Sequence, residues 1–159
     1  MRLNISGPVL RRTSLVLAAG AALVSLQARG ADDEKTQAEG IIFERQQVMM
    51  QLGKDADALG KIAAGQVPPD RLAATTKAIA DGARDSVEAF KQQVPGGHAK
   101  PEVWSNYADF TARMEKFAAS ADAMAKEGQT GNLGAVMGVM VEALPCKECH
   151  DLYREKKKS

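Results

Sequence analysis

The chain has 159 residues, with 21 basic and 20 acidic side chains, and 45% of its residues are hydrophobic but only 4% aromatic. This length gives room for one domain of ordinary size. The nearly balanced charge excludes the strongly basic surface that nucleic-acid binding requires, so we expect no nucleic-acid partner.

Residues 1–30 have the features of a secretory signal peptide. A positive region that contains Arg11-Arg12 precedes an uncharged apolar run over 13–26, which is too short to span a bilayer comfortably. We expect cleavage near Gly30/Ala31, leaving a mature domain over 31–159 that has no membrane span. That domain would keep 17 basic and 20 acidic residues, a net charge of −3.

The next segment predicts an amphipathic helix that begins near Asp32-Asp33-Glu34, where negative charge suits a helix N-terminus, and ends near Gly65. Its core-facing positions recur at spacings of three and four: Ile41, Arg45, Val48 or Met49, Leu52, Ala56, Leu59 and Ile62. A second helix opens at Asp70 and continues the same rhythm to Val94. Pro95-Gly96-Gly97 then stops it.

A third helix begins at Pro101, a residue that suits the first helical position, and ends before Gly128 to Gly131. Its apolar positions alternate by four and three: Val103, Tyr107, Phe110, Met114, Phe117, Ala121 and Met124. A fourth helix runs over 133–153, and Pro145 predicts a local kink within it. Four amphipathic helices, short connections and no strand pattern predict an all-α, antiparallel up-down-up-down four-helix bundle.

Cys146-Lys147-Glu148-Cys149-His150 reads C-x-x-C-H, the attachment sequence for a c-type haem. Two thiols at this spacing reach the two vinyl groups of one porphyrin, and the adjacent imidazole reaches the iron. We therefore expect one covalent, iron-containing haem c, with Cys146 and Cys149 as thioether anchors and His150 as the proximal ligand.

Three other readings of this motif are disfavoured by the rest of the chain. A redox dithiol belongs at a strand-to-helix junction, and no alternating βαβ pattern exists here. A closed four-ligand zinc site is hard to build, because the chain has only these two cysteines and one histidine, His98, besides His150. A disulfide closing two intervening residues would be strained and poorly stabilising.

Three stretches of the chain resemble the class II c-type cytochromes, that is the cytochrome c′ family and its low-spin relatives. Arg45-Gln46-Gln47-Val48-Met49 is similar to the family's R-x-x-x-M, Lys100 to Trp104 to its K-P-x-[IV]-W, and Cys146 to Arg154 to its C-x-x-C-H-x-x-[YF]-R. The resemblance covers nearly all of the mature chain and implies a periplasmic bundle. Pro145 departs from the small residue expected at its position.

The resemblance implies that residue 49 points at the distal face of the haem. Met49 either binds the iron or only packs in the core, and Met50 is the adjacent alternative. The resemblance also implies that Arg45, one turn before Met49, pairs with a haem propionate. The alternative is that Arg45 is an exposed charge on the helix.

Three further residues are candidates for haem contact. Trp104 either leans over the haem or caps the end of the bundle. Tyr153 is expected to pack against the bundle. Arg154 follows His150 by four residues and is therefore expected on the same helix face, beside the imidazole or in solvent.

The leading hypothesis is a soluble periplasmic electron carrier that exchanges electrons with partner proteins. The alternative is a five-coordinate protein that binds NO or CO at an open distal face. A third is an interaction bundle that never receives haem. An enzyme is not expected, because no nucleophile–base pair can be identified. The resemblance also allows a homodimer through the first two helices.

Overall fold

A computed structural model describes the backbone of residues 19–156 and the side chains of residues 32–156. Residues 1–18 of the predicted signal peptide lie outside the described part. Residues 19–30 form the start of α1 (Ala19–Ala63), which continues through the predicted cleavage site. In the described part of the chain, no helix is long and apolar enough to cross a membrane.

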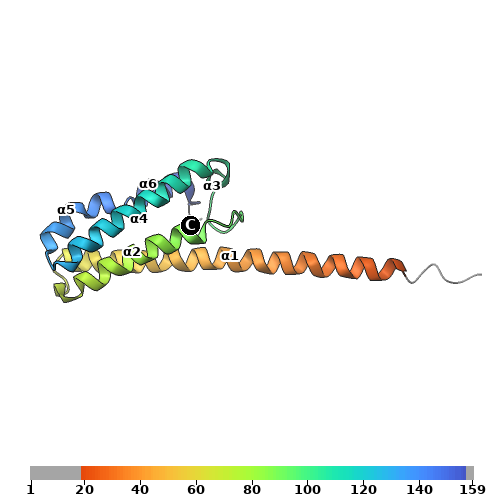
Figure 1. The fold of residues 1–159 in the computed structure, drawn as a ribbon, viewed down its shortest axis with the longest axis horizontal. Helices are drawn as coiled ribbons and strands as arrows, with labels where there is room; N and C mark the ends of the chain where they lie inside the picture. Colours follow the sequence, from red (N-terminus) through yellow and green to blue (C-terminus); the bar gives the residue numbers. More distant parts are fainter. Residues whose placement is uncertain (1–18, 157–159) are drawn as a thin grey trace, which may run out of the picture. The chain divides into compact units, whose positions relative to one another are not determined.

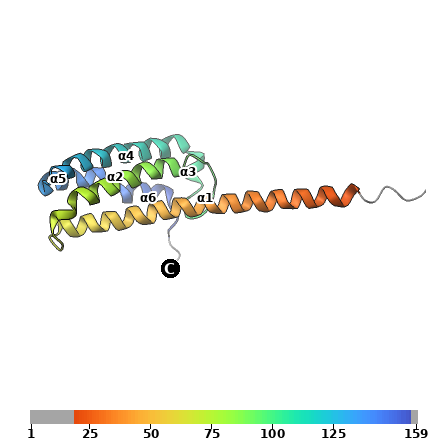
Figure 2. The same cartoon turned by 60° about the horizontal axis from the view of Figure 1, so that its bottom comes forward.

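The chain divides after Gln37, and the compact unit from Ala38 onward holds the rest of α1 and all later helices. These begin with η1 (Pro69–Arg71) and α2 (Leu72–Ala89). They continue with α3 (Glu102–Ser105), α4 (Tyr107–Gln129), α5 (Leu133–Ala143) and α6 (Cys146–Tyr153). In Figures 1 and 2, α2, α4 and the pair α5–α6 run alongside the later half of α1. The all-α four-helix bundle is thus confirmed, and residues 19–156 contain no strand, only a single bridge between Ala99 and Arg154.

The third and fourth predicted helices are each interrupted. Pro145 separates α5 from α6, so the predicted kink is a break, as expected where proline removes a backbone donor. Asn106, with φ −124° and ψ 45°, separates α3 from α4, so an uninterrupted third helix was wrong. Both Val103 and Phe110 are nevertheless buried, because apolar spacing reports which side faces the core and not whether the backbone is continuous.

The second helix is shorter than predicted. α2 ends at Ala89, so Val94 lies in the loop that leads to α3 and not on a helix. Gly96 and Gly97 have positive φ angles of 131° and 66° in this loop. A Cβ atom on Gly96 would lie 2.7 Å from Cδ1 of Ile42, so glycine lets the loop pass close to α1.

The core contains two clusters of buried side chains. The larger one joins α1, α2, α4 and α5 and is centred on fully buried residues such as Leu59, Ile79 and Met124. The smaller one joins Val103, Phe110, Met114 and Tyr153. Met49 packs against both, so it lies where the two clusters meet.

Candidate functional site

The three residues of the haem motif lie on one short helix. α6 begins directly after Pro145, and its i, i+3, i+4 spacing brings Cys146, Cys149 and His150 to one cavity. Both thiols are free, and burial raises the pKa of each. Burial also lowers the pKa of His150, and the charge of Arg154 adds to that effect. A neutral imidazole is the form that ligates iron.

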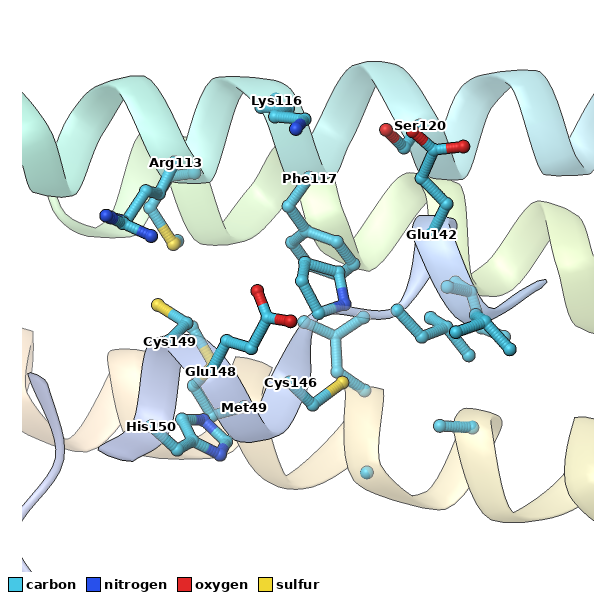
Figure 3. Close-up of a pocket in the computed structure, with 18 of the residues that line it drawn as sticks. Met49, Arg113, Lys116, Phe117, Ser120, Glu142, Cys146, Glu148, Cys149 and His150 are labelled. Carbon is cyan, nitrogen blue, oxygen red and sulfur yellow. The ribbon is translucent and has the colours of Figure 1, made fainter. Parts of the chain in front are cut away.

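This cavity has a volume of about 670 Å³. It is lined by Cys146, Cys149 and His150 of α6 and by Arg113, Lys116 and Phe117 of α4, and Figure 3 shows Cys149 on the side of α6 nearer α4 and His150 on the opposite side. A second cavity of about 390 Å³ shares four lining residues with the first: Met49, Met114, Cys149 and His150. The two cavities are therefore adjacent on either side of the motif, and the larger one has room for a flat cofactor.

Met49 is the methionine that the structure brings to the motif. It lines both cavities together with His150, and Figure 3 shows it close to Cys149 and His150. Of the two cavities, Met50 lines only the second, and its side chain is 49% exposed. The structure therefore distinguishes the two neighbours: Met49 is partly buried against both core clusters, whereas Met50 is exposed.

Arg45 is buried, with 4% of its surface exposed, so the alternative of an exposed helix charge is wrong. Its guanidinium carbon lies 5.0 Å from the ring centroid of Phe90 and 5.1 Å from that of Trp104. Nη2 donates a hydrogen bond of 2.6 Å to the carbonyl of Val94. Burial lowers the pKa of Arg45.

Two buried donors have no partner among the described residues: Nη1 of Arg45 and Nε1 of Trp104. Of these two residues, only Arg45 lines the second cavity. Buried donors are normally satisfied, so Nη1 of Arg45 fits an anionic or carbonyl acceptor from a bound group. A haem carboxylate has the required chemistry, and the residues present therefore fit the cofactor that the motif implies.

Trp104 does not line either cavity. It lies on α3, and its ring stacks on that of Phe90 at the end of α2, with centroids 6.2 Å apart and an interplanar angle of 28°.

Tyr153 and Arg154 differ sharply in their surroundings. Tyr153 is 6% exposed and packs in the smaller cluster, as expected. Arg154 is the residue that follows α6: its amide still donates to the carbonyl of His150 at 3.0 Å, as in a helix, whereas its own backbone is extended, with φ −115° and ψ 133°. Its side chain is exposed but still lines the second cavity with His150.

Sequence reasoning missed two residues around the motif. Asp109 accepts a hydrogen bond from the Tyr153 hydroxyl, and Phe90 supplies one wall of the Arg45 site. Phe90 falls within the second predicted helix, whose apolar rhythm gives no indication of a contact with Arg45. No sequence signal links Asp109 to Tyr153, because neither spacing nor type marks a contact across 44 residues.

A family model described as Cytochrome C′ matches residues 40–154. A cytochrome c-556 from Agrobacterium fabrum is 33% identical over 125 residues, which are 76% of this chain and 84% of that protein. A cytochrome c′ from Rubrivivax gelatinosus is 36% identical over 110 residues, 64% of this chain and 85% of that protein.

Solved structures show the same fold. The crystal structure of cytochrome c′ from Rubrivivax gelatinosus has a TM-score of 0.66 at 28% identity, covering 72% of this chain and 94% of that one. A nitric oxide complex of a cytochrome c prime variant from Alcaligenes xylosoxidans has a TM-score of 0.69 at 24% identity, over 76% and 97% of the two chains.

Proposed function

Because the chain belongs to the cytochrome c′ family, whose members carry covalent haem c, we propose that it is a periplasmic electron-transfer protein whose haem iron is ligated by His150 and Met49. The bound haem would supply an iron that changes reversibly between its ferric and ferrous states. The chain would supply the rest: two thioether anchors, two axial ligands and a cavity to hold the cofactor. No enzymatic role is proposed.

The attachment residues are assigned from the motif and from their place in the cavity. Cys146 and Cys149 would hold the porphyrin through thioether bonds, and His150 would approach the iron from the same helix. The unpartnered Nη1 of Arg45 supports a haem carboxylate in the second cavity. Trp104 would act through Arg45, whose guanidinium it covers.

The observation that carries the electron-transfer proposal is the position of Met49. It lines both cavities with His150, whereas Met50 is half exposed. A thioether and an imidazole together favour the ferrous state and keep the iron six-coordinate in both redox states, which suits rapid electron exchange. Electron-exchange partners would be proteins of the same compartment.

A five-coordinate protein that binds NO or CO is the second candidate. Met49 also packs against both core clusters, which is compatible with a purely steric role. The family contains relatives named cytochrome c′ as well as relatives named cytochrome c-556. In this candidate the apolar face around Met49 would leave the sixth iron position open.

The optical spectrum of the holoprotein, oxidised, reduced and with carbon monoxide, separates the two candidates. We expect a low-spin wild type with little response to carbon monoxide. Met49→Ala should become high-spin and bind carbon monoxide, because it removes the sixth ligand. Met50→Ala is the matched control and should retain the wild-type spectrum.

A wild type that is already high-spin and shifts fully with carbon monoxide would reject ligation by Met49. Gas binding would then become the proposed function. A Met49→Ala variant that stays low-spin would also reject Met49, because another group would have to hold the sixth position.

A further inference from the structure

The helix that carries the haem motif has one buried side chain. α6 spans the eight residues Cys146–Tyr153, and only Tyr153 among them is buried. Cys146 is exposed, and Cys149 and His150 are partly exposed at the cavity. As far as contacts with the other helices are concerned, the position of α6 therefore depends strongly on Tyr153.

Tyr153 is held from several sides. Its hydroxyl donates to Oδ2 of Asp109 and accepts from Nδ2 of Asn106 at 3.3 Å. Its ring meets Phe110 edge-on, with centroids 5.2 Å apart and planes at 76°. Its carbonyl accepts from the amide of Lys100 at 3.0 Å. These contacts connect the end of α6 to α4, to the junction before α4 and to the preceding loop.

Asp109 is itself fixed on α4. Nε of Arg113, one turn later, donates to its Oδ2 at 2.6 Å. This hydrogen bond and the one from Tyr153 lower the pKa of Asp109, so the carboxylate is ionised at neutral pH. A hydrogen bond to an ionised acceptor is stronger than one between neutral groups, and it is directional.

We propose that Tyr153 and Asp109 are positioning residues for His150, which they hold at a defined distance and tilt relative to the iron. The proposal rests on the assignment of His150 as the proximal ligand. Tyr153 follows His150 by three residues, about one turn of the same helix, so a shift of the phenol is passed through one rigid turn to the imidazole. The family pattern quoted above accepts Tyr or Phe at this position, so the pattern itself does not require the hydroxyl.

The test uses the haem-loaded protein and compares Tyr153→Phe with Tyr107→Phe. Tyr107 is the only other tyrosine, and its hydroxyl donates to the carbonyl of Phe90 at 3.0 Å, away from α6. Both variants lose one hydroxyl and keep the ring. Two quantities are measured: hydrogen exchange of the α6 amides by mass spectrometry, and the g-values of the ferric iron by electron paramagnetic resonance.

We expect Tyr153→Phe to speed exchange in α6 about tenfold and to shift the ferric g-values, with Tyr107→Phe unchanged in both. Asp109→Ala should reproduce the effect. Asp109→Asn keeps an acceptor oxygen and should recover part of the wild-type spectrum. The g-values respond to axial ligand geometry in high-spin and low-spin iron alike, so the test does not depend on Met49.

Faster exchange in α6 with unaltered g-values would overturn the positioning role and leave only a structural anchor. Equal behaviour of Tyr153→Phe and Tyr107→Phe would overturn it completely. Failure of the assignment of His150 as the proximal ligand has a different signature: the ferric g-values would be the same in the wild type and in His150→Gly. Exchange in α6 would still respond to Tyr153→Phe in that case.

Discussion

The guanidinium of Arg45 lies over the indole ring of Trp104, with its central carbon 5.1 Å from the ring centroid. Phe90 covers a second side at 5.0 Å, and the carbonyl of Val94 accepts from Nη2. The cation is thus shielded from water by aromatic rings, while Nη1 keeps a free hydrogen-bonding capacity. Such a buried charge attracts a carboxylate more strongly than an exposed arginine does.

Arg45→Gln should therefore lower the midpoint potential of the haem. A propionate that loses its cationic partner keeps an uncompensated negative charge, which stabilises ferric iron relative to ferrous iron. The lost cation–π contacts and the bond to Val94 should also cost about 2–3 kcal/mol of unfolding free energy. Potentiometric titration and urea unfolding measure the two effects.

Arg84→Gln is the control for this prediction. Arg84 is exposed and pairs with Asp81 and Asp122 on the surface, so its replacement should change both quantities little. An Arg45→Gln variant with the potential of Arg84→Gln would contradict pairing between Arg45 and the haem.

Replacing the cysteines tests the covalent attachment. Cys146→Ser and Cys149→Ser should each keep haem through one thioether bond, whereas the double variant should release all of it to acidified organic solvent. Mass spectrometry of the intact protein, expressed in cells able to mature c-type cytochromes, measures the haem adduct. A wild-type mass without that adduct would support the hypothesis of a bundle that never receives haem.

Gly128→Ala should destabilise the bundle. Gly128 is buried where α4 passes α2, and a Cβ atom there would overlap Oγ1 of Thr76 and lie 2.9 Å from Cβ of Thr76. Thr76 is also buried and bound to the carbonyl of Leu72, so it has little room to move. Overpacking should outweigh the gain in helix propensity and cost about 1–2 kcal/mol by urea unfolding.

The control is Gly60→Ala, at a helical glycine with no atom within 4 Å of the added Cβ. This change should stabilise the protein by about 0.5–1 kcal/mol. The two substitutions should change the free energy of unfolding in opposite directions, which separates the effect of close helix packing from that of helix propensity. A stabilising Gly128→Ala would contradict the close contact between Gly128 and Thr76.

Asp109 should contribute to stability in a pH-dependent way. The hydrogen bond from Arg113 lowers the pKa of Asp109 most, and the hydrogen bond from Tyr153 adds to this effect, so the pKa in the folded state lies below the ordinary value. The contribution is therefore complete above the pKa of the unfolded chain, near pH 4, and is lost as the pH falls through the folded-state value.

Asp109→Asn should accordingly melt below the wild type at pH 7 and approach it in acid. Thermal unfolding from pH 7 to pH 2.5 measures the difference. Asp81 and Asp151 also have lowered pKa values. Both residues are present in the wild type and in the variant, so their contributions cancel in the comparison. A difference in melting temperature that does not depend on pH would exclude an ionised Asp109 as its source.

The sequence by itself determined the features that depend on neighbouring residues. Periodic apolar positions predicted the four-helix bundle, and Pro145 predicted a kink before Cys146. The C-x-x-C-H spacing predicted the attachment of a haem. Helix periodicity, proline's missing donor and the reach of two thiols are all local physical chemistry, so they can be recognised along the chain.

Only the tertiary structure decided which of the candidate side chains are buried and what they contact. Arg45 is covered by Phe90 and Trp104, the loop after α2 takes Val94 out of the helix, and Tyr153 meets Asp109 across 44 residues. Each of these contacts joins segments that are distant in sequence, and its free energy depends on burial and geometry that exist only once the helices pack together.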